Sequence, residues 1–286
     1  MRKLFTIIAY TALMLFIGRS LTFLPKIQKI QTLYSNDKTL TTIINNDIHK
    51  APGNYSIYIT DLFSPLAVSI NEKQIHTAAS VNKIPIVAVL YALSQQRKIN
   101  LDEKITIQKN DIQDYGTGSL RYEKPGRTYS IKTLVKLTLK QSDNTAAHVL
   151  ANKIGMDVIQ KMITSWGLSQ TDMKTNKSTV YDMSILFRKI YNNEITTPAL
   201  TQELLGFMKN TENEKRLPKN LSSNVTVYHK TGDGVGNIHD VGLIIYKNHV
   251  YFVGVMTTDV GNYEKETEEK IAQIAKDTVS FIQSLD

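Results

Sequence analysis

Apolar residues recur at two different periods along the chain, and the changes of period predict where strands and helices lie. Alternation with period two predicts strands over 55–59, 66–70, 225–230, 238–246 and 250–257, the last two forming a hairpin. Spacings of three and four residues predict helices around and between these strands. The helices are expected over residues 38–48, 81–96, 130–140, 144–154, 157–166, 181–192, 198–210 and 271–285.

The order of these elements predicts the fold class. It runs helix, two strands, many helices, three strands and helix, and it lacks the β-α-β alternation of a doubly wound parallel sheet. We therefore expect an α+β (α/β sandwich) domain over 36–286, with a five-stranded antiparallel sheet covered by the terminal helices. The helices of about 80–200 form an inserted all-helical subdomain, and a cleft between the two parts is the expected site.

The first 24 residues have the character of an export signal. Two basic residues follow Met1, residues 4–17 are apolar apart from two threonines, and a second apolar stretch ends before Pro25. Small residues at 18 and 20 allow a cleaved signal, whereas the length to residue 24 allows a retained transmembrane anchor. We favour the anchor, followed by a polar stalk over 25–35. The expected location is then extracytoplasmic and membrane-anchored, the alternative being a secreted or periplasmic protein.

Composition narrows the chemistry further. The 286 residues include no cysteine, which excludes disulfides, cysteine nucleophiles and cysteine-based metal sites. The net charge of +8 comes from basic residues interleaved with acidic ones, which favours a mixed solvated surface over a nucleic-acid site. The six histidines lack the spacing of zinc ligands. We expect a monomer with no nucleic-acid partner, no metal and no cofactor.

Three short motifs carry the candidate chemistry: Ser80-Val-Asn-Lys83, Ser142-Asp143-Asn144 and Lys230-Thr231-Gly232. Each has an ordinary explanation when taken alone: a helix N-cap and a surface lysine, a capped helix junction, and a strand that ends in a turn. A second Ser-x-x-Lys at residues 35–38 lies in the predicted stalk and lacks a following apolar helix, so we interpret it as chance. The significance lies in the joint occurrence and order of the three motifs.

Physical chemistry selects Ser80 as the candidate nucleophile. A serine hydroxyl needs an adjacent base, and a residue three positions further along a helix lies beside it. Ser80 at the start of a helix therefore has Lys83 alongside, with helix N–H groups near a developing oxyanion. Lys83 can act as base only if its pKa is lowered, and we expect partial burial and a second cation, Lys230, to lower it.

The chain resembles class A β-lactamases, because the three motifs together are the set found in those enzymes and in penicillin-binding proteins. Tyr115–Leu120, Thr133–Ala147 and Tyr228–Gly236 add to the resemblance, which covers about residues 35–286. It implies the β-lactamase/transpeptidase-like fold, with the two parts inferred above. A serine hydrolase that forms an acyl-enzyme is the activity it implies.

The resemblance also implies roles for the motif residues. Ser80 attacks a lactam or peptide carbonyl, Lys83 helps to remove its proton, and Ser142 relays a proton to the leaving nitrogen. The backbone N–H groups of Ser80 and Asp233 form the oxyanion hole. Asp143 is expected to brace its loop.

The remaining motif residues are implied to bind the substrate. Asn144 holds the substrate amide and contacts Lys83. Lys230 and Thr231 bind the substrate carboxylate, and Gly232 belongs to the same motif. The implied substrate is a β-lactam or a D-Ala-D-Ala peptide.

One element of the family pattern is missing. Class A enzymes carry a Glu-x-x-Leu-Asn loop whose glutamate activates the deacylating water, and the segment after Trp166 contains no such motif. Asp172 and Asp182 are the only carboxylates near it, and Asp182 has the position of a first-turn helix residue. A positioned general base contributes about 10²–10⁴-fold in rate, so we expect slow deacylation.

Three functions stay open from the sequence. The first is a β-lactamase, and the second is a D-Ala-D-Ala peptidase or penicillin-binding protein that stays acylated. The third is a non-catalytic sensor domain on the outer face of the membrane. A Ser-His-Asp triad is not excluded, although the chain has no Gly-x-Ser-x-Gly elbow.

Overall fold

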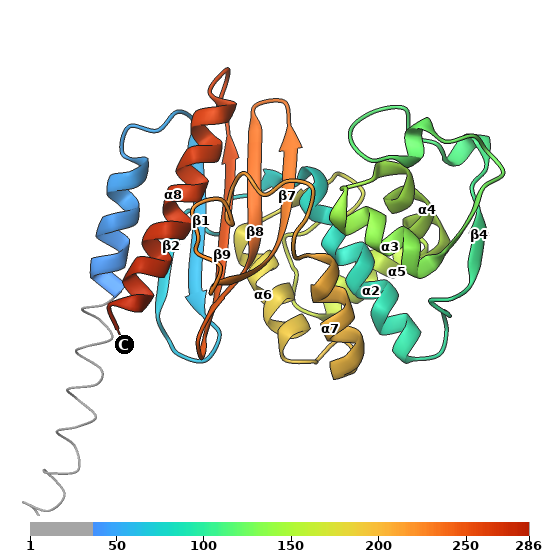
Figure 1. Ribbon diagram of the computed structural model, residues 1–286, viewed down its shortest axis with the longest axis horizontal. Coiled ribbons are helices and arrows are strands. Elements are labelled where there is room, and N and C mark those ends of the chain that lie inside the picture. The colour runs from blue at the N-terminus through green and yellow to red at the C-terminus, as the bar shows by residue number, and fades with distance from the viewer. Residues whose placement is uncertain (1–36, 286) are drawn as a thin grey trace, which may run out of the picture.

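Five strands form one antiparallel sheet, which lies beside a group of helices (Figure 1). The computed structural model describes residues 37–285. The order in the sheet is β2-β1-β9-β8-β7, so the two strands before the helices pair with the three that follow them. The strands are β1 (Asn54–Asp61), β2 (Ala67–Ile70), β7 (Thr226–Gly234), β8 (Asn237–Tyr246) and β9 (His249–Thr258).

Both faces of the sheet are covered, which explains the nearly continuous apolar sequence of its central strands. On one face, the helix over residues 37–48 and α8 (Glu264–Gln283) pack through Leu40, Ile274 and similar residues. On the other face, α6 (Val180–Tyr191) packs on the sheet, and the rings of Phe187 and Phe252 lie 5.6 Å apart. The sheet is therefore a rigid support for its edge strand β7.

The helical part is built around α2 (Lys83–Gln95), which is buried from Lys83 to Leu93. Burial on all sides accounts for its apolar sequence, which lacks a polar face. Around it lie α3 (Ile131–Lys140), α4 (Asn144–Ile154), α5 (Met156–Ser165) and α7 (Pro198–Phe207). Short strands complete this part: β3 (His76–Thr77) with β6 (Lys177–Ser178), and β4 (Lys104–Thr106) with β5 (Thr128–Ser130).

Side-chain caps fix where several of these helices begin. Ser130, Asp143, Thr179 and Thr197 each accept a hydrogen bond from the backbone N–H three residues further on. Each cap satisfies an N–H that lacks a partner within its helix. The start of α4 matters most, because its cap belongs to the Ser142-Asp143-Asn144 motif.

The predicted α+β class, the five-stranded antiparallel sheet and the inserted helices are confirmed. Several boundaries were wrong. The last helix, expected from residue 271, begins at Glu264, and the helix expected over 198–210 ends at Phe207. The strand expected over 225–230 continues to Gly234, because β8 pairs with it as far as Gly234 opposite Asn237. The helix expected from residue 81 begins as a 3₁₀ turn, Ala79–Asn82, and becomes an α-helix only at Lys83.

The expected anchor (1–24) and stalk (25–35) lie outside the residues that the structure describes. Over residues 37–285, no helix combines the length and the apolar character that a membrane span needs.

Candidate active site

The candidate nucleophile lies on the short turn that leads into α2. Ser80 belongs to the 3₁₀ turn Ala79–Asn82, and Lys83 is the first residue of the α-helix. Ala79 has a left-handed backbone conformation, with φ of 50°. The Nζ atom of Lys83 lies 2.9 Å from Oγ of Ser80, within reach for direct proton transfer.

Lys83 is enclosed by oxygen atoms from the second motif. Its Nζ lies 2.6 Å from Oδ1 of Asn144 and 3.1 Å from Oγ of Ser142, and it also donates to the Ser142 carbonyl. Burial lowers the pKa of Lys83 from 10.5 to about 8, against the opposing effect of Asp143. A pKa near 8 makes the neutral amine accessible close to neutral pH.

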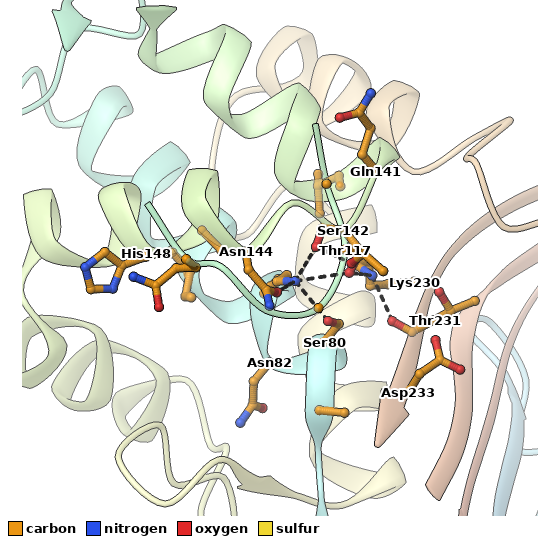
Figure 2. Close-up of a pocket in the computed structure, with 18 of the residues that line it drawn as sticks. Ser80, Asn82, Thr117, Gln141, Ser142, Asn144, His148, Lys230, Thr231 and Asp233 are labelled. Atoms are coloured by element: carbon orange, nitrogen blue, oxygen red, sulfur yellow. Dashed lines mark hydrogen bonds between the residues drawn. The ribbon is translucent and has the colours of Figure 1, made fainter. Parts of the chain in front are cut away.

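Ser142 connects the two lysines of the site. It lies in the tight junction between α3 and α4. Its backbone φ is 56°, a conformation that residues other than glycine rarely adopt. Its Oγ is 3.1 Å from Nζ of Lys83 and 2.9 Å from Nζ of Lys230. Its hydroxyl therefore bridges the helical part and the sheet, as Figure 2 shows.

The carboxylate of Asp143 stabilises this junction through hydrogen bonds. Its two carboxylate oxygens accept hydrogen bonds from the N–H groups of Ala146 and Leu120, both at 2.8 Å, and the residue is buried. A Cβ at Gly118 would lie 2.2 Å from an Asp143 oxygen, so only glycine fits this close approach. The expectation that Asp143 braces its loop agrees with these contacts.

The third motif lies on the edge strand β7, opposite Ser80. Lys230 is buried, and its pKa lies well below the usual value, first because of burial and then because of Lys83. We expected the charge of Lys230 to help lower the pKa of Lys83, and that part of the prediction is wrong. Burial lowers the pKa of Lys83, whereas the charge of Lys83 helps to lower the pKa of Lys230. A Cβ at Gly232 would lie 3.0 Å from the Ala78 carbonyl oxygen, so glycine lets β7 approach the nucleophile turn.

Asp233 stands at the exposed side of the same strand, beyond Thr231 (Figure 2). Its side chain is 51% exposed and forms an ion pair with Arg216, whose side chain is only 2% exposed. Arg216 also donates to the carbonyl of His239 at 2.8 Å and pairs with Glu268 at 3.1 Å.

All eight predicted site residues come together around one cleft of about 1100 Å³ between the helical part and the sheet. Ser80, Lys83, Ser142 and Lys230 form a continuous set of contacts of 2.9–3.1 Å. Asn144, Thr231 and Asp233 line the same cleft, and Gly232 lies between the last two on β7. The residues of the three motifs therefore form one site in the cleft between the helical part and the sheet, as expected.

The segment after Trp166 supplies no carboxylate to this cleft. Asp172 binds the backbone N–H groups of Lys174 and Thr175, and its pKa is lowered by these bonds. Asp182 is buried against Thr171, 2.8 Å away. Among residues 37–285, the carboxylates that line the cleft are those of Glu212 and Asp233.

Sequence reasoning missed several residues that shape the cleft. Asn176 belongs to none of the three motifs. Its side chain accepts a hydrogen bond from Asn82 at 2.9 Å, and its backbone carbonyl accepts one from the N–H of Ala78. Met173 lines the cleft from the same segment. Arg216 was also missed, because a single arginine in a loop carries no signal in the sequence. His148 lines the cleft from α4, apart from the cluster around Ser80 (Figure 2).

Within residues 37–285, no group of three or more histidine or acidic side chains has the arrangement of a metal site. His229 and His239 are strand residues, as expected, on β7 and β8. His229 contacts Asp240 at 2.9 Å and Glu214 at 3.1 Å, and these carboxylates raise its pKa to about 9 against the effect of burial.

Comparison with known proteins agrees with this architecture. The family model described as "Beta-lactamase enzyme family" matches residues 39–282. The β-lactamase VEB-1 of Pseudomonas aeruginosa is 25% identical over 279 residues, covering 87% of this chain and 93% of that protein. The β-lactamase BRO-1 of Moraxella catarrhalis is 24% identical and covers 71% and 72%.

Solved structures are similar as well. The structure of PBP-A superposes with a TM-score of 0.80 at 26% identity, covering 86% of this chain and 96% of that one. An acyl-enzyme complex of a PBP-A variant with penicillin G gives a TM-score of 0.78 at 24% identity, covering 88% and 97%. The extended-spectrum enzyme TLA-1 gives 0.79 at 22% identity, covering 86% and 98%. The last two establish likeness of fold alone.

Proposed function

Since the chain belongs to the β-lactamase enzyme family, we propose that it is a serine hydrolase that β-lactams acylate on Ser80. The observation that carries the proposal is the unbroken contact from Ser80 through Lys83 and Ser142 to Lys230. A hydroxyl beside a lysine of lowered pKa is an activated nucleophile. The β-lactamases and penicillin-binding folds similar to this chain support the same substrate class.

The proposed acylation uses these contacts in sequence. Neutral Lys83 takes the proton of Ser80 as the oxygen attacks the lactam carbonyl carbon. The backbone N–H groups of Ser80 and Asp233 stabilise the oxyanion. Ser142 passes a proton to the lactam nitrogen as the C–N bond breaks, and its contact with Lys83 at 3.1 Å provides the route back.

The strand edge positions the substrate in this proposal. In the described sheet β7 is an edge strand, so its outer backbone groups can pair with an extended acyl group. Lys230 and Thr231 bind the substrate carboxylate, and Asn144 binds the side-chain amide. Asn144 is held for this task, because its Nδ2 donates to the Tyr115 carbonyl at 3.0 Å while its Oδ1 accepts from Lys83.

Slow deacylation is part of the proposal. Asp172 and Asp182 are engaged in contacts within their own segment, and Met173 and Asn176 line the cleft in their place. A missing general base costs about 10²–10⁴-fold in rate, so the acyl-enzyme accumulates. The same observation favours a second candidate, a D-Ala-D-Ala peptidase or penicillin-binding protein, and the likeness to PBP-A supports it.

Labelling with a fluorescent penicillin tests the proposal. We expect one labelled band for the wild type and none for Ser80→Ala, with slow turnover of a chromogenic cephalosporin. Release of D-alanine from a D-Ala-D-Ala peptide would select the second candidate. Ligand binding that survives Ser80→Ala without labelling in either protein would instead identify a non-catalytic sensor domain.

We further propose an extracytoplasmic, membrane-anchored monomer, on the basis of the basic and apolar sequence of residues 1–24. Membrane fractionation of the full chain, compared with a chain beginning at residue 36, tests the anchor. Recovery of the full chain in the soluble fraction would contradict it, and sedimentation of the shorter chain tests the monomer.

A further inference from the structure

The turn that carries Ser80 is held in place by contacts from outside it. Ala79 has a φ of 50°, and such a conformation persists in a residue other than glycine only where the surrounding structure fixes it. Strand β3 leads into this turn. The backbone carbonyl of Thr77, the last residue of β3, accepts a hydrogen bond from Nε2 of His239 at 2.8 Å. Since His239 lies on β8, this bond joins the turn to the central sheet.

The imidazole of His239 also takes the place of a main-chain pair between two strands. In the described sheet, the pairing of β8 with β9 ends at Asp240 opposite Val255. Beyond that point, the N–H of Thr257 on β9 donates to Nδ1 of His239 at 3.1 Å. The side chain is fully buried. One ring nitrogen therefore contacts β9 and the other contacts β3.

These two bonds determine which nitrogen of the His239 ring carries the proton. A backbone N–H can only donate, so Nδ1 must accept from Thr257. A backbone carbonyl can only accept, so Nε2 must carry the hydrogen that is donated to Thr77. A ring protonated on both nitrogens would place a second N–H against that of Thr257. The arrangement therefore requires the neutral imidazole with its hydrogen on Nε2.

The groups around His239 keep its ring neutral. Burial lowers the pKa of His239, and the charge of Arg216 adds to this effect, whereas the bond to Thr77 and the charge of Asp233 oppose it. The ring of His76, on β3, lies edge-on at 6.0 Å between centroids. Burial first, and His239 second, lower the pKa of His76 to about 4. Both imidazoles are therefore neutral at pH 7.

We propose that His239 is a positioning residue for the acylation of Ser80. By donating to Thr77, it fixes the strand end that leads into the turn, and the Ser80 hydroxyl stays within 2.9 Å of Nζ of Lys83. A displacement of about 1 Å can cost 10²-fold in rate, so a bond three residues before the nucleophile affects the reaction. The inference rests on the proposed acylation, and it adds a residue that belongs to none of the three motifs.

Two substitutions of His239 that keep different halves of its bonding provide the test. His239→Gln retains a donor near the position of Nε2, whereas His239→Asn is one methylene shorter and retains only an acceptor for Thr257. Acylation by benzylpenicillin is followed by stopped flow over a range of concentrations. This series separates the dissociation constant of the non-covalent complex from the first-order acylation rate constant.

We expect His239→Asn to lower the acylation rate constant about 10- to 100-fold. The dissociation constant should change by about twofold at most, because Lys230 and Thr231 stay in place for the substrate carboxylate. His239→Gln should acylate within about threefold of the wild type, because its amide still donates to Thr77. A role in stability alone would not produce this division between the two constants or this rescue.

Two further measurements separate positioning from disturbance of the fold. Ile274→Val trims the core between α8 and the sheet, and it should lower the urea midpoint while both acylation constants stay unchanged. Nitrogen NMR of the wild type at pH 7 reports the protonation of each imidazole. We expect the His239 signals, identified by their loss in His239→Gln, to show hydrogen on Nε2 and none on Nδ1.

Each outcome supports or overturns the inference. If benzylpenicillin acylates the wild type and His239→Asn keeps its acylation rate constant, positioning by His239 is wrong and the proposed function stands. An equal loss in His239→Gln, a similar loss in Ile274→Val, or hydrogen on Nδ1 at pH 7 would also overturn it. If benzylpenicillin does not acylate the wild type, the proposed function fails and this inference fails with it.

Discussion

The lowered pKa of Lys83 leads to a quantitative prediction for the pH dependence of acylation. With a pKa of about 8, roughly a tenth of the molecules carry the neutral amine at pH 7 and roughly nine tenths at pH 9. At the ordinary value of 10.5, the neutral fraction at pH 7 would be roughly 300 times smaller. Burial of Lys83 therefore accounts for most of the neutral amine that is available as a base at pH 7.

The direction of the pH dependence follows from the role of the Lys83 amine as a base. The base must be neutral, so the acylation rate should rise about tenfold per pH unit below pH 7.5 and level off above the pKa. Stopped-flow measurement of acylation by benzylpenicillin, from pH 6 to 9, provides the profile. Lys83→Ala should lose the rising limb and at least about 100-fold in rate.

Asp143→Asn provides a matched variant for this prediction. The Asp143 carboxylate raises the pKa of Lys83, so its removal should shift the midpoint of the profile to lower pH. Asparagine can keep the cap on α4 through its Oδ1, but its amide nitrogen cannot accept the hydrogen bond from the Leu120 N–H. A flat profile in the wild type, or a midpoint that moves upward in this variant, would refute the assignment of Lys83 as base.

Three further predictions concern separate parts of the structure. Gly232→Ala should slow acylation about tenfold and lower the free energy of unfolding by about 1–2 kcal/mol, measured by urea denaturation, because its Cβ would crowd the Ala78 carbonyl. Met173→Glu should accelerate deacylation about tenfold or more by placing a carboxylate in the cleft wall, and Met173→Gln should not. The raised pKa of His229, about 9 against 6.5, stabilises the fold fully below pH 6.5, and this contribution, about 3 kcal/mol, should disappear as pH rises through 9. A pH-independent free energy of unfolding between pH 7 and 9.5, or the same decline in His229→Gln, would contradict the last prediction.

The sequence predicted most of the fold because its strongest signals are local. The apolar sequence of α2 reflects burial on every side, and Ser130 and Thr197 mark helix starts by their own hydrogen bonds. The end of β7 was misjudged, because glycines and an aspartate usually indicate a turn. In the structure Gly232 is required by close packing, and strand pairing continues past it.

The site was predictable only as far as its residues form motifs. Ser80 and Lys83 lie three positions apart, so their contact follows from helix geometry, whereas 88 positions separate Ser142 from Lys230. Resemblance to a family, rather than spacing, brought those two together. Arg216 lies in a loop and forms an ion pair with Asp233, a contact that depends on tertiary structure alone.

In the proposed function, Ser80 becomes acylated and water removes the acyl group slowly. Time-resolved intact mass measurement of the penicillin-treated protein, followed by peptide mapping, tests both parts together. We expect a single adduct of one penicillin mass on the peptide that contains Ser80, and we expect it to persist after free penicillin is removed. An unmodified mass at every time point, or an adduct on another residue, would contradict it.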